Sequence, residues 1–292
     1  SIALVVHRFP PKSIGGTEVY VERLAHALSR HHKVSVFYRD NDESDTFTEE
    51  RACRDGIRLW RVRRAFRPRQ ANPAALFRDT FQNADIEASF ERFLDETKPD
   101  LVHFNHLMSL SYRLIAQAKR RQLPCVLTLH DYWFICPNSQ LIRPNGKVCA
   151  GKAMGFNCAR CAVGRFAKRW LNLTLPATAI AFQIRDRLVR QAALHADLLI
   201  APSHFLLQRY LKEGFPVERL LYLENGVDIS QIRRHTVRRP PSGDRLRVSY
   251  LGALAWQKGV HILVEAFRDL PPERATLRVY GDLSLFPEYS SY

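Results

Sequence analysis

Short apolar, β-branched runs alternate with amphipathic stretches along most of the 292 residues. The apolar runs predict strands at Ile2–His7, Lys33–Tyr38, Ile57–Val62, Asp100–Asn105, Pro124–His130, Asp197–Ala201, Leu220–Glu224, Leu246–Leu251 and Leu277–Tyr280. The amphipathic stretches predict helices at Thr17–Arg30, Asp79–Thr97, Ser109–Arg121, Phe166–His195, Ser203–Glu213 and Gly259–Leu270. This alternation indicates an α/β fold with a parallel sheet covered on both faces. Ligands of such sheets bind beyond the carboxyl ends of the strands, so the loops there are the first place to look for chemistry.

One polar segment, residues 229–244, interrupts the alternation. It contains Arg-Arg, Pro-Pro and Ser-Gly pairs and has no apolar periodicity, which is typical of a linker between domains. We therefore expect a Rossmann-type domain over residues 1–228 and a second one over residues 245–292. The second segment is far shorter than the ~100 residues that a doubly wound domain normally needs, so we expect it to be incomplete.

The composition is strongly basic, with 44 Lys and Arg against 29 Asp and Glu and a net charge of +15. This excess favours anionic partners, such as nucleotide phosphates, acidic lipid headgroups or nucleic acid, without choosing among them. A zinc-containing nucleic-acid-binding protein fits poorly, because the sequence has no compact finger, homeodomain or RNA-recognition signature. We therefore expect no specific nucleic-acid partner.

Membrane association is a separate question. No apolar run approaches the ~20 residues that span a bilayer, and the N-terminus has no signal peptide, so we expect a cytoplasmic protein. The predicted helix Phe166–His195 and its flank suggest peripheral contact with the acidic inner face of a membrane. The basic and apolar residues that suggest this contact are Arg165, Lys168, Arg169, Arg185, Arg187 and Arg190, beside Trp170, Phe182 and Leu188.

Two loops after predicted strands in the first domain carry candidate binding residues. After the first strand come Gly15, Gly16 and Thr17, just before a helix. Glycines let the backbone approach a ligand, and the helix N-terminus offers N–H groups to an anion, although an ordinary loop-to-helix turn has the same pattern. His130 and Asp131, at the carboxyl end of an internal strand, are the candidate catalytic residues. A histidine there can hydrogen-bond a hydroxyl or move a proton, or it can merely satisfy a loop carbonyl.

Four cysteines cluster in the next segment, a predicted loop over residues 136–161. They are Cys136, Cys149, Cys158 and Cys161, and the last two form a C-x-x-C pair on one tight turn. Such a set suits a closed, tetrahedral zinc site with a structural role. An iron–sulfur cluster, disulfides or unpaired thiols are the alternatives.

In the second domain, the strand ending at Leu251 leads to Gly252 and then to Lys258 and Gly259 at a helix start. Backbone N–H groups together with one cation there predict a phosphate-binding turn, and an exposed lysine on a first helical turn is the alternative.

These segments together resemble the retaining nucleotide-sugar glycosyltransferases of the GT-B fold, glycosyltransferase family 4. The resemblance covers nearly the whole chain. Its matching stretches are Gly15–Glu18 with the helix that follows, Leu129–Phe134, Ala201–Phe205, Glu224–Asp228 and Tyr250–Gly259. A cysteine-rich loop after His-Asp-Tyr-Trp also occurs in a subset of that family.

The resemblance implies a role for each matching residue. Gly15 and Gly16 would shape the loop near the donor phosphate and the acceptor, His130 would hydrogen-bond the donor sugar, and Lys258 would neutralise the departing diphosphate. It also implies a UDP-, GDP- or ADP-linked sugar donor, a saccharide or lipid-linked acceptor in polysaccharide biosynthesis, and no catalytic metal.

The sequence departs from the family at two points. Ala253 stands where the family commonly has arginine, and the later Glu-x7-Glu region has no counterpart. We therefore expect the 292-residue chain alone to have little or no transferase activity, and an inactive acceptor-binding module is the alternative.

Overall fold

The computed structural model describes residues 1–13, 15–40, 46–63, 72–166, 174–227 and 245–282. The chain divides into two compact units, Ser1–Asp228 and Ile229–Tyr292. The expected linker, 229–244, lies outside the described residues. Within the described ranges no helix combines the length and the apolar character that crossing a membrane requires.

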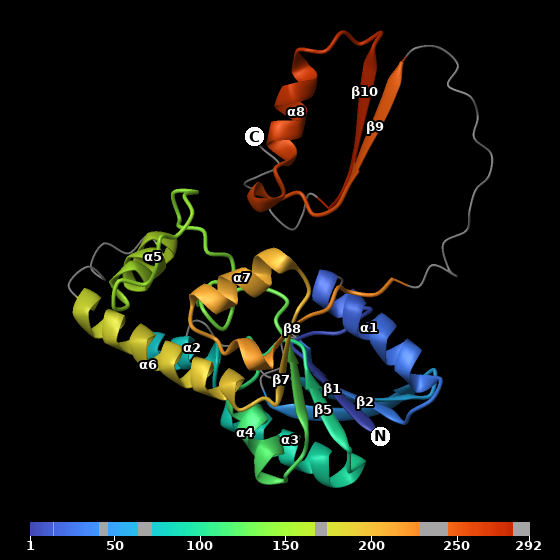
Figure 1. The fold of residues 1–292 in the computed structure, drawn as a ribbon, viewed down its shortest axis with the longest axis vertical. Coiled ribbons are helices and arrows are strands. Elements are labelled where there is room, and N and C mark those ends of the chain that lie inside the picture. Colours follow the sequence, from blue (N-terminus) through green and yellow to red (C-terminus); the bar gives the residue numbers. More distant parts are fainter. Residues whose placement is uncertain (14, 41–45, 64–71, 167–173, 228–244, 283–292) are drawn as a thin grey trace. The chain divides into compact units, whose positions relative to one another are not determined.

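The first unit is built on one eight-stranded sheet with the spatial order β3-β4-β2-β1-β5-β6-β7-β8 (Figure 1). All neighbouring strands are parallel except the pair β3–β4. This confirms the α/β class and the seven strands predicted in this part of the chain, because short apolar runs were the right signal for buried parallel strands. The strands are β1 Ile2–Val6, β2 Val34–Asp40, β3 Thr48–Arg54, β4 Ile57–Arg63, β5 Leu101–Phe104, β6 Cys125–Thr128, β7 Leu198–Ala201 and β8 Leu220–Tyr222.

Strand β3 was not predicted from the sequence. It reads Thr-Glu-Glu-Arg-Ala-Cys-Arg and shows no apolar alternation, because it is an antiparallel edge strand with little burial. Charge pairs tie it to β4: Glu50 contacts Arg61 and lies 2.7 Å from Arg63. Such charges also discourage edge-to-edge association of sheets.

The helices of the first unit follow the predicted pattern with two corrections. The expected helix Asp79–Thr97 begins only at Ala84, because the Asn83 side chain caps α3 by accepting from the N–H groups of Asp85 and Ile86, and the short helix α2 before it was not predicted. The cysteine-rich segment, expected to be a loop, contains the helix α5. The helices are α1 Gly16–Ser29, α2 Pro73–Asp79, α3 Ala84–Thr97, α4 Arg113–Arg120, α5 Phe156–Phe166, α6 Leu175–Leu194 and α7 His204–Lys212.

Each face of the sheet has its own core, and strand periodicity separates them. Leu4 and Val6 of β1 pack with Val21 of α1 on one face. Ala3 and Val5 point to the opposite face, where α3, α4 and α6 supply the partners (Figure 1). The loops at the carboxyl ends of β1, β5 and β6 are therefore held between two packed layers.

The second unit contains two parallel strands, β9 Leu246–Leu251 and β10 Ala275–Tyr280, joined through the helix α8 Val260–Arg268. The predicted strand–helix–strand order is confirmed. The second strand begins two residues earlier than its apolar run, because Ala275 and Thr276 pair in register with Leu246 and Arg247.

Candidate functional site

Polar side chains gather where three neighbouring strands of the first unit end. β1 is followed by His7, β5 by Asn105 and His106, and β6 by His130 and Asp131. Because β1, β5 and β6 lie side by side and run in parallel, these residues meet at one edge of the sheet. His7, Asn105 and His106 were not predicted as site residues, although the same strand-end rule that selected His130 would have found them.

The His130 ring is held in one orientation by Asn105. The Asn105 amide nitrogen donates to the carbonyl of His103 (3.3 Å), so its Oδ1 faces His130 Nε2 as an acceptor at 3.1 Å. The proton of the imidazole is therefore on Nε2, and Nδ1 keeps its lone pair. Burial, together with His106 and His103, lowers the pKa of His130 to about 3, so the ring is neutral at physiological pH.

The buried His106 and the partly exposed Asp131 form a pair beside this ring. The N–H of Met108 donates to His106 Nδ1 (3.2 Å), which leaves the proton on Nε2 to donate to Asp131 Oδ2 (2.8 Å). The other oxygen, Oδ1, accepts from the N–H of Trp133 (2.8 Å). Burial opposes ionisation, but His106 and these hydrogen bonds outweigh it and hold the pKa of Asp131 below its usual value. Both carboxylate oxygens are thus engaged.

A second polar chain joins this pair to the first loop. The His7 ring packs against the His106 ring with centroids 4.3 Å apart, and its Nε2 lies 3.5 Å from Glu18 Oε1. Ser13 Oγ donates to the same Glu18 oxygen (3.0 Å). Burial, with His106 nearby, lowers the pKa of His7 well below its usual value. Contacts of His7 with His106, and of His106 with Asp131, therefore join the loops that follow β1, β5 and β6.

The two glycines of the first loop differ in the space that surrounds them. Gly15 is the N-cap residue of α1, and the Glu18 carboxylate folds back over it so closely that a Cβ at residue 15 would collide with Glu18 Oε2. A Cβ at Gly16 would meet nothing within 4 Å. Thr17, the third candidate residue, lies inside the first turn of α1 and does not cap the helix. Gly16 is thus the open position of the turn.

The surroundings of this loop are basic. A cavity of about 70 Å³ is lined by Arg8, Lys12 and Arg39 together with Phe9, Ser13 and Asp40. Lys12 lies 3.5 Å from Asp40, and Arg39 donates to the carbonyl of Ser109 (2.8 Å). Three cations against one acid give this corner a positive potential that suits an anionic ligand.

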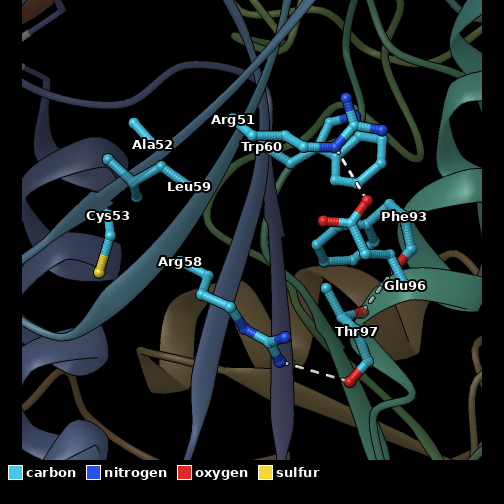
Figure 2. A pocket seen from close by; sticks show the side chains of 9 residues that line it. All are labelled: Arg51, Ala52, Cys53, Arg58, Leu59, Trp60, Phe93, Glu96 and Thr97. Carbon is cyan, nitrogen blue, oxygen red and sulfur yellow. Dashed lines mark hydrogen bonds and ion pairs between the residues drawn. The ribbon is translucent and has the colours of Figure 1, made fainter.

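A larger cavity, about 250 Å³, lies between the β3–β4 edge and α3, and no predicted site residue lines it. Figure 2 shows the Arg51 guanidinium over the Trp60 ring, 3.9 Å from its centre, and hydrogen-bonded to Glu96 (2.8 Å). Arg58 donates to the Thr97 carbonyl (3.3 Å). Because its charged groups bond to one another, this cavity offers little to a polar ligand.

In the second unit, Lys258 ends a short 3₁₀ turn, Trp256–Lys258, and its side chain is exposed. Gly259 follows at φ +69°, a left-handed conformation that explains why glycine stands there, and α8 begins directly after it. The turn is therefore formed as the sequence predicted, and its phosphate-binding role stays a prediction.

The helix proposed to touch a membrane is partly buried. Arg185 is 1% exposed and Phe182 packs inward, so neither belongs to a lipid-facing surface. Arg190 donates to the Gly214 carbonyl (2.6 Å). Residues 167–173, with Lys168, Arg169 and Trp170, lie outside the described residues. The prediction is wrong for Arg185 and Phe182, because Arg185 packs on Trp133 and Phe182 packs on Phe77 beneath α5.

The four clustered cysteines are free thiols in the structure. Cys136 follows the β6 loop, Cys149 ends a short hairpin, and Cys158 and Cys161 lie on α5, not on a tight turn. Burial, with Asp186 and Cys136 nearby, raises the pKa of Cys158 to about 12. Over the described ranges, no three His, Cys, Asp or Glu side chains stand as a ready-made metal-binding group.

Comparison with known proteins identifies the family. The model of Glycosyltransferase Family 4 matches residues 14–231, which is most of the chain and includes nearly all of the strand-end site. The chain belongs to glycosyltransferase family 4. A protein of the capsule (cps) region of Klebsiella pneumoniae, described as an uncharacterised 42.6 kDa protein, is 22% identical over 271 residues. These cover 89% of this chain and 62% of that protein, so the chain spans less than two thirds of this relative.

Solved structures agree on the fold. The lipopolysaccharide outer core galactosyltransferase WaaB in its apo form aligns with a TM-score of 0.54 at 15% identity, over 100% of this chain and 63% of WaaB. Anabaena Alr3699/HepE in complex with UDP and glucose aligns with a TM-score of 0.51 at 15% identity, over 99% of this chain and 63% of that one. An α,α-trehalose-phosphate synthase from Burkholderia xenovorans gives 0.53 at 11%, over 99% and 68%. These likenesses confirm the predicted GT-B-type architecture.

Proposed function

We propose that this family 4 chain takes part in moving a hexose from a nucleotide sugar to a saccharide or lipid-linked acceptor, with retention and without a catalytic metal. The observation that carries the proposal is the neutral His130 imidazole at the carboxyl edge of the sheet. Asn105 fixes its Nε2–H, which leaves Nδ1 to accept a hydrogen bond from a ligand hydroxyl. A donor hexose presents such hydroxyls near its reacting carbon.

Asp131 has a positioning role in this proposal. Its two oxygens each accept one hydrogen bond, from His106 and from the Trp133 N–H, and the lowered pKa of the carboxyl makes it a weak base toward an acceptor hydroxyl. It fixes the turn that carries His130. The open Gly16 backbone and the basic corner at Arg8 and Lys12 would face the anionic part of a ligand.

The leaving diphosphate needs compensation of its charge. Lys258 and the N-terminus of α8 supply a cation and free N–H groups in the second unit, and we propose that they act on it. The relatives support a UDP-linked donor, because HepE was solved with UDP and glucose.

The test measures transferase activity of the full-length protein with and without the substitution His130→Ala, with UDP-, GDP- and ADP-hexoses as donors. Loss of a transition-state hydrogen bond should lower kcat/KM by about 10²-fold, whereas His31→Ala, on an exposed residue, should change nothing. Unchanged turnover in His130→Ala would refute the site. Ligand binding without any turnover would favour the inactive acceptor-binding module.

A further inference from the structure

The part of the chain from Cys136 to the end of α5 carries four cysteines and very little apolar core. Its hairpin is held by backbone bonds between Arg143 and Lys147 (2.9 Å) and between Cys149 and Leu141 (2.7 Å). The buried cluster under α5 consists of Ala159, Ala179 and Phe182. Val148 and Met154 are 78% and 75% exposed. A segment with so small a core needs another source of stability, and a structural metal is one that small modules commonly use.

The four thiols come from three separate pieces of chain and face the same region. Cys136 Sγ donates to Asn138 Oδ1 (2.7 Å), and Asn138 Nδ2 donates to Cys161 Sγ (3.7 Å), so one amide side chain bridges two of them. Cys158 interacts electrostatically with both Cys136 and Cys149. The fold therefore brings together residues up to 25 positions apart in the sequence.

Near the thiols, two positively charged side chains face one negatively charged side chain, and an anionic metal centre would offset this difference. The buried Arg185 bonds to Asp186 Oδ1 (3.0 Å), and Lys152 lies 3.2 Å from Asp186 Oδ2. Two cations thus share one carboxylate. Arg185 also interacts electrostatically with Cys136 and Cys158. A divalent cation with four thiolates is a net anion, and it would be attracted by the nearby Arg185 and Lys152 side chains.

We propose that Cys136, Cys149, Cys158 and Cys161 bind one structural zinc ion as thiolates, with release of their protons to solvent. Four thiolates complete a tetrahedral shell and leave no position for substrate. Among the described residues the four thiols are free and form no close ligand group, so binding has to bring them nearer to one another. The ion would join the hairpin and α5 to the turn at Cys136, five residues after Asp131. This inference does not depend on the proposed transferase activity.

The first experiment measures the metal content of the chain purified without chelator. We expect about one zinc per chain, and less than about a tenth of that in a Cys158→Ser/Cys161→Ser double variant, since thiolate ligands supply nearly all of the affinity. Cys53→Ser is the matched control, because Cys53 is exposed on the edge strand β3 and lies outside the cluster. It should keep the zinc of the wild type.

A second measurement on the wild type guards against a double variant that does not fold. Titration with an organomercurial should release zinc in step with the reaction of four thiols, and Co²⁺ exchanged into the protein should show the absorption of a tetrathiolate complex. Wild-type protein that takes up neither Zn²⁺ nor Co²⁺ would overturn the proposal. So would iron with inorganic sulfide, a disulfide detected by mass spectrometry, or zinc retained in the folded double variant.

Discussion

Arg185 offers the sharpest test of how the site is supported. This arginine of α6 is 1% exposed, donates to the Trp133 carbonyl (2.8 Å) and to Asp186 (3.0 Å), and lies over the Trp133 ring at 4.8 Å. Trp133 in turn donates its N–H to Asp131. Replacing Arg185 by Met keeps much of the volume. It leaves the Trp133 carbonyl without this partner and Asp186 with Lys152 as its remaining cation.

The expected magnitude follows from these contacts. An unsatisfied buried carbonyl costs about 1–3 kcal/mol, and breaking a buried ion pair from one side costs about 3–5 kcal/mol in total. We expect Arg185→Met to lower the free energy of unfolding of the first unit by about 3–5 kcal/mol. For a domain of this size that corresponds to a fall in Tm of roughly 6–20 °C.

The assay is urea denaturation followed by circular dichroism and by tryptophan fluorescence. Arg187→Met is the matched control, because Arg187 lies on the same helix but is exposed, and its change should stay within about 0.5 kcal/mol. A double-mutant cycle with Asp186→Asn should give a coupling energy of about 1–3 kcal/mol. Equal, small losses in Arg185→Met and Arg187→Met would refute the reasoning.

Two further predictions concern the strand-end site. Gly15→Ala should destabilise the first unit by about 0.5–1.5 kcal/mol, because the new Cβ would push the Glu18 carboxylate away from its hydrogen bond with Ser13. Gly16→Ala should change stability by less than about 0.5 kcal/mol and should weaken ligand binding, and an equally large loss of stability in both variants would contradict this. The pKa of His130 is about 3 in the folded protein, whereas it is about 6.5 in an unfolded chain. Between these pH values the unfolded state binds more protons, so the free energy of unfolding falls as the pH drops from about 6.5 to about 3. Urea titrations across that range should show a flatter pH dependence for His130→Gln than for the wild type, with the exposed His31→Gln as control; parallel curves for all three would show that His130 does not titrate as described.

The sheet was predictable because strands buried on both faces require short apolar runs in the sequence. β1 and β6 are such runs, and the chemistry-bearing residues follow them directly. Apolar runs do not predict a strand that is largely exposed. β3 is polar because it lies at an edge and is stabilised by charge pairs with β4. The helix α5 could not be predicted in the same way, because its glycine, asparagine and cysteines favour a loop and it makes few apolar contacts.

The candidate site was predictable only in part, because its decisive contacts join residues distant in sequence. His130 could be chosen from its place after a strand, but its protonation state depends on Asn105, 25 residues earlier. In the same way, the position of Asp131 in the sequence suggests a carboxylate available for catalysis, whereas His106 and the Trp133 N–H occupy both of its oxygens. Such hydrogen-bond partners are set by the fold, and no local sequence pattern encodes them.

The connections between the loops suggest why these residue types stand at this edge. A neutral histidine can present a lone pair to a hydroxyl only if its other nitrogen has a fixed acceptor, and Asn105 provides one. A nearby ionised carboxylate favours protonation of that histidine, and Asp131 exerts this pull on the His130 pKa. Burial and the neighbouring histidines outweigh it, while Asp131 is tied to His106 on one side and to the backbone on the other. The network thus keeps the Asp131 carboxylate charged and the His130 imidazole neutral within the same small volume, and it leaves Nδ1 of His130 able to accept a hydrogen bond.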